Sequence, residues 1–479
     1  MTRSDAIALA DASFASGRFE DRLAQLVAIP SCSQDPALEP ELERYLIGGI
    51  IPWLSGMGFR SEVHPNARGG GTILLLERIE SPELPTVITY GHGDGVLGMD
   101  GEWSQGLVPW ALQRRHDRWY GRGTADNKGQ HVINLFALEA VLQARDGRLG
   151  FNVTLVLEMA EERGSIGLRE FVQVNAQRLA ADVFIASDGP RGSPGMPTIA
   201  AGSRGNYHFD LIVAPRKGGV HSGHWGGLTD DPAIVLSHAL AAICDRNGRI
   251  LVRDWLPEGG APLPDRIRSM LEGCPLDPGT DAARIEPDWG EPALSPAEKL
   301  YAWNSFIVLS MLSGKSEQPM NAVAPDAIAH CQIRYVPGTD PEIIVPALRR
   351  HLDAAGFQDV RIENGRIGMP ASAKPLPNEW VEFVARSFTE SLGIPSQVIP
   401  QVSGGMPGDV FQDVLSVPLV WIPHGHNGCK QHGADEHLLI EVARQGVRGF
   451  AGLWWDLGER SGRVGLSAGA RRFARPASG

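Results

Sequence analysis

The sequence lacks any run of about 18 consecutive apolar residues, the length that a membrane-spanning helix needs. Its first residues also lack a sustained apolar core and include Asp5, Asp11 and Glu20, so they do not resemble a secretory signal. Cysteine is scarce, and the five cysteines are widely scattered, which favours reduced thiols over a disulfide framework. We therefore expect a cytoplasmic protein with no membrane partner.

Positive charge is also in short supply. The chain has 44 Lys and Arg residues against 56 Asp and Glu residues, a formal net charge of −12. An anionic protein repels phosphate backbones, so we expect no nucleic-acid partner. The 479 residues, 43% hydrophobic and 21% charged, match ordinary globular usage and predict two or three domains with sizeable cores.

Short apolar runs alternate with a helical pattern between residues 84 and 190. PTVITYGHGD, FNVTLVLEMAEE and DVFIASDG predict buried strands, and KGQHVINLFALEAVLQA predicts a helix after the first strand. This alternation is typical of an α/β domain with a mostly parallel sheet flanked by helices.

A second pattern begins near residue 204. NYHFDLIV and DAIAHCQIRYV predict half-buried strands, while PAIVLSHALAAICD and PEIIVPALRRHLDAAGF predict helices, as in a small α+β domain. SVPLVWIPHGHNG then returns to the buried-strand pattern, so the small domain is predicted to be inserted into the first one. We expect a first domain of residues 1–203 and 373–460, an inserted domain of residues 204–372, and a loose tail, 461–479. Within the insertion, the Pro- and Gly-rich stretch 255–297 is expected to be a surface excursion.

Side chains of metal-ligand type follow the predicted buried strands, where open α/β sheets place their ligand sites. They are His92, Asp94, Asp126, Glu161, Glu162, Asp188 and His432. Two imidazoles and three carboxylates suit Zn²⁺, with Mn²⁺ or Co²⁺ as alternatives. A carboxylate shared by two ligand sets can bridge a pair of ions about 3.5–4 Å apart, which predicts two divalent cations. Glu161, next to a ligand carboxylate, would then be free to act as a general base.

Other polar residues compete with this set. His424, His426 and His437 are rivals to His432, which ranks above them because it opens the HGADEH stretch. Cys429 has the chemistry of a zinc ligand but also that of a small buried thiol. From strand alternation alone, Arg334 is as consistent with a solvent-facing strand residue as with a functional one.

Nine stretches run in the order of a known family over nearly the whole chain. They are YGHGD (90–94), WYGRGTADNKG (119–129), EMAEERGSIGL (158–168), ASDGP (186–190), GSRG (202–205), HSGHWGG (221–227), QIRYVPGTD (332–340), SGGMPGD (403–409) and HGADEH (432–437). With them the chain resembles the two-zinc metallopeptidase family of carnosine dipeptidases, aminoacylases, carboxypeptidase G and succinyl-diaminopimelate desuccinylase. It is most similar to the carnosinase-like dipeptidase branch.

The resemblance implies a zinc-peptidase-like catalytic domain with an inserted lid and dimerisation domain. It also implies that His92 and Asp188 hold one ion, that Glu162 and His432 hold the other, and that Asp126 bridges them. In the family, the residue matching Asp94 orients the imidazole of the ligand matching His92, and the residue matching Glu161 is the general base. The Asp126–Asn127 peptide bond is expected to be cis.

The remaining implied roles concern the substrate and the dimer. In the family, the residue matching His221 reaches the partner's active site and stabilises the oxyanion, and the one matching Arg334 clamps the substrate carboxylate. Asn321, Gly404 and Gly405 lie at positions near the C-terminal end of the substrate, but they depart from the hydroxyl and small polar residues usual in the family. We therefore expect a homodimer with His221 completing the partner's site.

Three functional hypotheses follow. The leading one is metal-dependent hydrolysis of an amide bond in a small carboxylate-bearing substrate, above all a dipeptide. The second is an N-acyl- or N-carbamoyl-amino-acid amidohydrolase that uses the same metals and base. The third, a non-catalytic binding protein, is disfavoured because all five ligand positions and the base are present.

Overall fold

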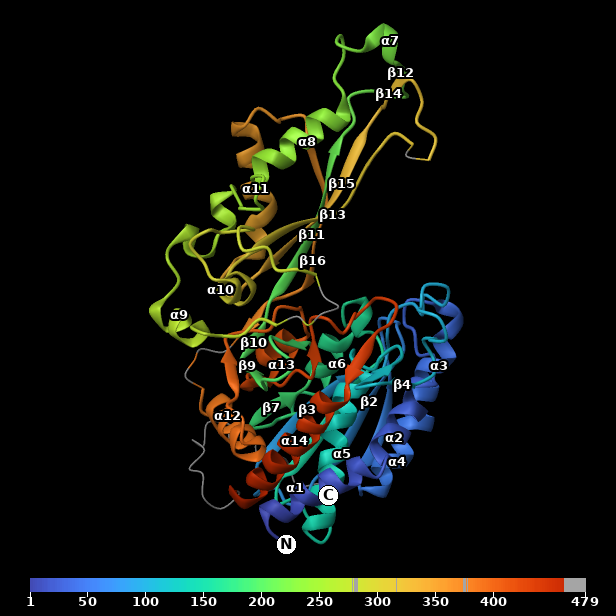
Figure 1. Ribbon diagram of the computed structural model, residues 1–479, viewed down its shortest axis with the longest axis vertical. Coiled ribbons are helices and arrows are strands. Elements are labelled where there is room, and N and C mark those ends of the chain that lie inside the picture. Colours follow the sequence, from blue (N-terminus) through green and yellow to red (C-terminus); the bar gives the residue numbers. More distant parts are fainter. Residues whose placement is uncertain (278, 280–282, 316, 374–375, 377, 461–479) are drawn as a thin grey trace.

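The computed structural model describes residues 1–479 except 278, 280–282, 316, 374–375, 377 and 461–479, so the expected tail lies outside the described residues. Two sheets, each with its own helices, follow one another along the long axis of the molecule (Figure 1). Among the described helices, none combines the length and the apolarity needed to cross a bilayer.

The larger sheet has eight strands in the order β1-β2-β6-β3-β7-β19-β9-β18. Its four central strands run parallel: β6 (Asn152–Glu158), β3 (Thr86–His92), β7 (Val183–Ala186) and β19 (Leu419–Trp421). The flanking strands are β1 (Arg60–Pro65), β2 (Thr72–Arg78), β9 (Thr198–Ala200) and β18 (Gln397–Ile399), and both β2 and β9 run antiparallel to the centre. The α/β fold with parallel strands at its centre confirms the prediction.

Helices cover both faces of this sheet because successive strand residues point to opposite sides. Leu74 and Leu76 pack in one core, while Ile73 and Leu75 pack in a second core on the other face. The first core is covered by α1 (Arg3–Ala15), α2 (Arg18–Val27), α4 (Ile51–Gly56), α5 (Lys128–Ala144), α12 (Glu379–Leu392) and α14 (Ile440–Arg460). The second is covered by α6 (Leu168–Val174) and α13 (Gly408–Leu415).

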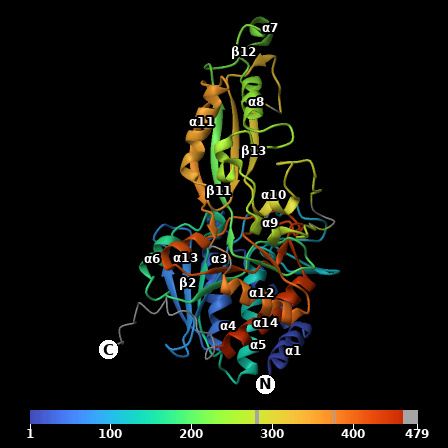
Figure 2. The same cartoon turned by 90° about the vertical axis from the view of Figure 1, so that its left-hand side faces the viewer.

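The smaller sheet is antiparallel, in the order β13-β15-β11-β16. Its strands are β13 (Ser305–Ser313), β15 (Ala327–Tyr335), β11 (Gly205–Val213) and β16 (Arg361–Met369), and α8 (Pro232–Ile243) and α11 (Ile344–Ala354) cover one face (Figure 2). The alternate residues of β15 from Ala327 to Tyr335 are all buried beneath these helices, as strand periodicity predicts. Gln332 and Arg334 therefore lie on the opposite, polar face.

The chain passes between the two sheets through two short strands that pair with each other. β10 (Gly202–Ser203) leaves the larger sheet, and β17 (Ser372–Ala373) returns to it antiparallel to β10. A Cβ atom at Gly202 would lie 1.9 Å from the carbonyl oxygen of Ser372, so this close approach requires glycine. The outgoing and returning chains therefore run side by side.

Most described residues of the stretch 255–297 are exposed, as expected for a surface excursion, but a few buried side chains fix the stretch to the protein. The stretch includes α9 (Asp265–Leu271), and α10 (Pro296–Tyr301) begins within it. Leu263, Leu271, Leu294 and Ala297 are buried in the second core of the larger sheet. Its apolar residues are spaced too irregularly among Pro and Gly for the pattern to reveal this packing.

Short strand pairs complete the fold. At the far end of the smaller sheet, β12 (Val220–His221) pairs with β14 (Ala322–Val323), and α7 (Ser222–Trp225) follows β12 (Figure 1). Near the larger sheet, β5 (Arg118–Tyr120) pairs with β4 (Gln113–Arg115) and with β21 (His437–Leu439), while β8 (Pro190–Arg191) pairs with β20 (Gly425–His426).

Candidate metal centre

The carboxyl ends of the central strands meet at one edge of the larger sheet. β3 ends at His92, β6 leads into Glu161 and Glu162, and β7 leads into Asp188. Because β6, β3 and β7 are neighbours and run parallel, these side chains arrive at the same place.

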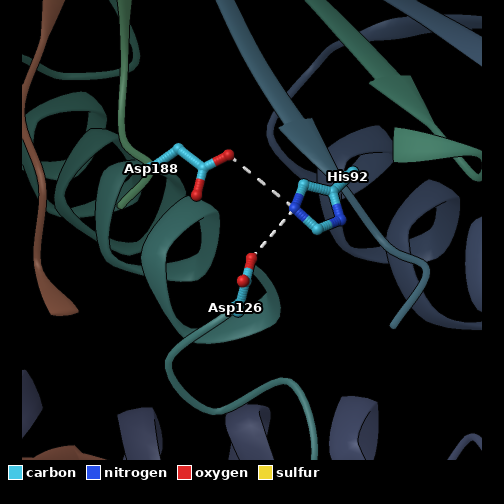
Figure 3. A group of neighbouring side chains, drawn as sticks. All are labelled: His92, Asp126 and Asp188. Carbon is cyan, nitrogen blue, oxygen red and sulfur yellow. Dashed lines mark hydrogen bonds and ion pairs between the residues drawn. The ribbon is translucent and has the colours of Figure 1, made fainter. Parts of the chain in front are cut away.

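His92, Asp126 and Asp188 form one ligand group, whose ligand atoms all lie within 4.8 Å of one another (Figure 3). Nε2 of His92 lies 3.2 Å from Oδ1 of Asp126 and 3.7 Å from Oδ2 of Asp188. Asp126 comes from the loop before α5 and therefore enters the group from outside the sheet.

Asp126, Glu162 and His432 form a second ligand group. Nε2 of His432 lies 3.1 Å from Oδ2 of Asp126 and 3.1 Å from Oε2 of Glu162. The two carboxylate oxygens of Asp126 thus face different imidazoles, as a bridging ligand would require. The Asp126–Asn127 peptide bond is cis, which confirms the prediction made from the sequence.

The carboxylates of Asp126, Glu161, Glu162 and Asp188 lie close together here, and their combined negative charge favours the binding of cations. Burial, together with the negative charge of Asp126, raises the pKa of Glu162 to about 7 and that of Asp188 to about 6. Burial also raises the pKa of Asp126, but hydrogen bonds with His432 and His92 outweigh it and leave that pKa lowered. Oε1 of Glu162 is buried with no hydrogen-bond partner among the described residues. Two divalent cations would neutralise these charges and use the unpaired oxygen, so the side chains fit such a pair.

Asp94 lies behind the two groups and contacts both. Its Oδ1 lies 3.3 Å from Nδ1 of His92, the ring nitrogen that faces away from Asp126. Its carboxylate also accepts hydrogen bonds from the backbone N–H groups of Glu161 (3.2 Å) and Glu162 (3.1 Å) and from the Ser33 hydroxyl (2.6 Å). Asp94 therefore fixes the imidazole and the glutamate pair together, the arrangement that metal-bound histidines usually need.

The rival ligands do not join either ligand group among the described residues. Nδ1 of His424 instead lies 3.2 Å from Nη2 of Arg191, and burial lowers the pKa of His424 well below its usual value. Cys429 is a buried free thiol whose pKa is raised to about 12 by burial.

Arg334 approaches this centre from the smaller sheet. Its Nε donates a hydrogen bond to Oε1 of Gln332 at 3.0 Å. Burial lowers the pKa of Arg334, and the negative charge of Glu161 opposes that shift, so the guanidinium and this carboxylate interact electrostatically. Arg334 is thus half-buried at the junction of the two sheets rather than fully exposed to solvent.

Gly404 and Gly405 belong to the loop before α13. A Cβ atom at Gly405 would lie 2.9 Å from Cβ of Met369, the last residue of β16, whereas one at Gly404 would meet nothing within 4 Å. The glycine turn therefore packs closely against the smaller sheet at Gly405, whereas at Gly404 there is room for a side chain.

His221 and Asn321 lie together, but not at the metal centre of their own chain. The carbonyl oxygen of Asn321 accepts a hydrogen bond from the backbone N–H of Ser222 at 3.0 Å, and both predicted residues are exposed. β12, which ends at His221, lies at the end of the smaller sheet farthest from β3 (Figure 1).

Sequence reasoning missed several buried polar residues that join the ligand loops. The side chain of Gln130 donates hydrogen bonds to the carbonyl oxygens of Ala125 (2.7 Å) and Gly189 (3.2 Å) and accepts one from the backbone of His424 (2.8 Å). Arg122 and Glu436 form a fully buried ion pair. Arg122 shares a motif with Asp126, and Glu436 shares one with His432. The opposite charges of these two residues were the signal that could have revealed the pair.

The model of the peptidase family M20/M25/M40 matches residues 88–456. The chain belongs to this family. The family match covers His92, Asp126, Glu162, Asp188 and His432, and it confirms the resemblance seen in the sequence.

Named relatives of the family match nearly the whole chain. The Beta-Ala-His dipeptidase of Rattus norvegicus is 26% identical over 94% of this chain and 95% of its own length. A Cys-Gly metallodipeptidase of Candida albicans is 29% identical over 91% of this chain and 93% of its own. The crystal structure of human carnosine dipeptidase 1 has the same fold, with a TM-score of 0.80 and 22% identity over 96% of this chain and 99% of that one.

Proposed function

We propose that this family member is a dinuclear metal-dependent dipeptidase that hydrolyses the amide bond of a dipeptide with a free carboxylate. The observation that carries the proposal is the pair of ligand groups sharing Asp126, with Glu161 beside them. Full-length relatives named for dipeptidase activity support the substrate class. The substrate is thus a small peptide rather than a protein chain.

We assign the ligands as two sets that share one carboxylate. His92 and Asp188 would hold one ion, Glu162 and His432 would hold the other, and Asp126 would be shared by both. Zn²⁺ is the preferred metal for this mixture of imidazoles and carboxylates, with Mn²⁺ or Co²⁺ as alternatives. When bound, such ions supply Lewis acidity toward the scissile carbonyl and make water more acidic.

Glu161 is the general base in this proposal. Its Oε2 lies 3.8 Å from Nε2 of His92, and its backbone N–H is fixed by Asp94. A carboxylate held there can take a proton from the attacking water and return it to the leaving amine, as general acid–base catalysis requires.

The smaller sheet, its tip and the loop before α13 supply the substrate contacts. Arg334 pairs with the substrate carboxylate, because a planar guanidinium can form two parallel hydrogen bonds with a carboxylate. Gly404 and Gly405 flank this end of the substrate from the loop before α13, and Asn321, at the tip beside His221, contributes to the site of the partner chain. We accordingly propose residues 1–203 and 373–460 as the catalytic domain and 204–372 as the inserted lid and dimerisation domain.

A homodimer completes the site in this proposal. His221 lies at the far tip of its own chain, so it can stabilise the oxyanion only in a partner's site. β13 is an edge strand whose Val308, Leu309, Met311 and Leu312 are exposed, an apolar edge that a second copy would cover. The five free cysteines support a reducing compartment, and we place the enzyme in the cytoplasm.

Metal reconstitution followed by a substrate panel tests the proposal. We expect about two divalent ions per chain by elemental analysis, and hydrolysis of α- and β-linked dipeptides detected by mass spectrometry. Removing the ions with a chelator should abolish turnover, and adding Zn²⁺, Mn²⁺ or Co²⁺ should restore it. Cleavage confined to N-acyl- or N-carbamoyl-amino acids would instead establish the amidohydrolase alternative, and absence of metal would contradict both enzymes.

A further inference from the structure

Arg122 and Glu436 form an ion pair inside the protein beside the metal centre. Nη1 of Arg122 donates to Oε2 of Glu436 at 2.7 Å, and each side chain is 1% exposed. A buried ion pair is weak evidence for stability in general, so its presence here needs a specific reason.

The other oxygen of Glu436 holds the loop that carries the shared ligand. Oε1 accepts hydrogen bonds from the backbone N–H groups of Gly123 (3.0 Å), Ala125 (2.9 Å) and Asp126 (3.0 Å). This loop precedes α5 and belongs to no helix or strand, so its N–H groups have no backbone ladder to satisfy them. The carboxylate of Glu436 supplies that partner and fixes the backbone of Asp126 directly.

The backbone of Glu436 ties the same loop to the second imidazole. Glu436 lies four residues after His432, and its carbonyl oxygen accepts a hydrogen bond from the N–H of Gly121 at 3.0 Å. The next residue begins β21, which pairs with β5, the strand that leads into the loop. One residue therefore links the segment of His432 to that of Asp126.

Arg122 anchors this assembly to the rest of the domain. Its Nη2 donates to the carbonyl oxygen of Leu97 at 2.9 Å, and its guanidinium lies 5.7 Å from the ring centroid of Trp103. Both oxygens of Glu436 are thus occupied by donors, which leaves Glu436 unsuited to be a metal ligand.

We propose that Glu436, held by Arg122, is a positioning residue that sets Asp126 against His432 so that both cations are retained. The inference rests on the proposed metal centre and extends it to a residue that touches neither metal nor substrate. Loss of partners that orient metal ligands typically lowers metal affinity by about 10–100-fold.

Glu436→Gln is the most direct variant. Glutamine keeps the shape but replaces one oxygen with an NH₂ group, so a donor must face either Arg122 or the backbone N–H groups. Arg122→Lys is a second variant, because lysine keeps the charge and loses the planar fork. Glu441→Gln is the matched control, since Glu441 is an exposed carboxylate on α14.

The experiment titrates the metal-free proteins with Zn²⁺ by calorimetry and records the melting temperature of each metal-free form. We expect folded Glu436→Gln to bind zinc about 10-fold or more weakly than wild type, and Glu441→Gln to match wild type. A melting temperature that falls while zinc affinity stays unchanged would show a merely structural role and overturn the proposal. If Glu436→Gln does not fold, unchanged affinity in Arg122→Lys overturns it, and a loss of affinity there supports it.

Titration of the wild-type protein tests the metal centre separately from the role of Glu436. A wild-type protein that binds no zinc contradicts the metal centre itself and the role of Glu436 with it. Two sites in wild type that are equally strong in the folded variants contradict only the role of Glu436.

Discussion

At the scale of single residues, the adjacent Glu161 and Glu162 differ in the groups that their carboxylates face. Oε2 of Glu162 lies 3.1 Å from Nε2 of His432 and joins a ligand group, whereas Glu161 belongs to neither group among the described residues. Asp94 holds the backbone N–H of each. In the proposed mechanism, one backbone anchor thus presents one carboxylate for binding a cation and another for moving a proton.

We expect Glu161→Gln to retain both metals and to lose about 10²–10⁴-fold in kcat, because the amide keeps the shape but cannot accept a proton. Glu162→Gln is the matched comparison and should instead lose metal, since Glu162 lies in a ligand group. Elemental analysis and steady-state kinetics on both proteins distinguish the two roles. Full turnover by Glu161→Gln with normal metal content would assign the base elsewhere.

At the scale of elements, the first and last described helices pack together and close the larger domain. α1 and α14 are joined by Arg444, whose Nε and Nη2 lie 2.7 Å and 2.8 Å from the two carboxylate oxygens of Asp11. The hydrogen bonds from Arg444 lower the pKa of Asp11, against the opposing effect of burial. α14 also packs on α5, the helix that follows the loop of Asp126. The contact between α1 and α14 is therefore linked to the metal centre through α5.

The Asp11–Arg444 pair makes stability depend on pH in a defined direction. A lowered pKa means that the pair stabilises the fold fully above the unfolded value of about 3.9 and loses this effect as pH falls through the folded pKa. Asp11→Asn should therefore cost about 0.5 kcal/mol at neutral pH, the size typical of a partly exposed pair, and almost nothing in strong acid. Thermal melts across pH check this, with exposed Asp21→Asn on α2 as the control. A difference from wild type that does not shrink on acidification would contradict the assignment.

At the scale of the whole molecule, the chain separates two predicted parts of its active site. The metal ligands lie at the edge of the larger sheet, and β12 with His221 lies at the opposite end of the smaller sheet (Figures 1 and 2). Arg334 lies between them, at the junction. A second copy that presents its tip to this junction would bring the parts together.

Mixing two inactive variants tests this arrangement. His221→Ala chains would lack the proposed oxyanion donor, and Glu161→Gln chains would lack the proposed base, yet a mixed dimer would contain one site with both residues intact. Loss of an oxyanion donor typically costs about 10²–10³-fold in kcat, so partial recovery on mixing should be measurable. Light scattering should show a dimer at assay concentration. No recovery despite verified subunit exchange, or full activity of a monomer, would rule out the shared site.

The sequence by itself determined the parts of the site whose signal is local. Buried strands that end in polar residues indicated His92, Glu161, Glu162 and Asp188, and strand alternation indicated that β15 is half-buried. These features depend on the period of the backbone and on the edge at which parallel strands end, so neighbouring residues are enough to reveal them.

Only the tertiary structure decided how distant segments meet. It placed the two oxygens of Asp126 against imidazoles 34 and 306 residues away, and it buried Glu436 beneath a loop 310 residues earlier. It also packed Leu271 and Leu294, from a stretch with no periodic pattern, into the second core. Such contacts join segments whose separation in sequence carries no periodic signal, so they exist only once the sheets, helices and loops have packed together.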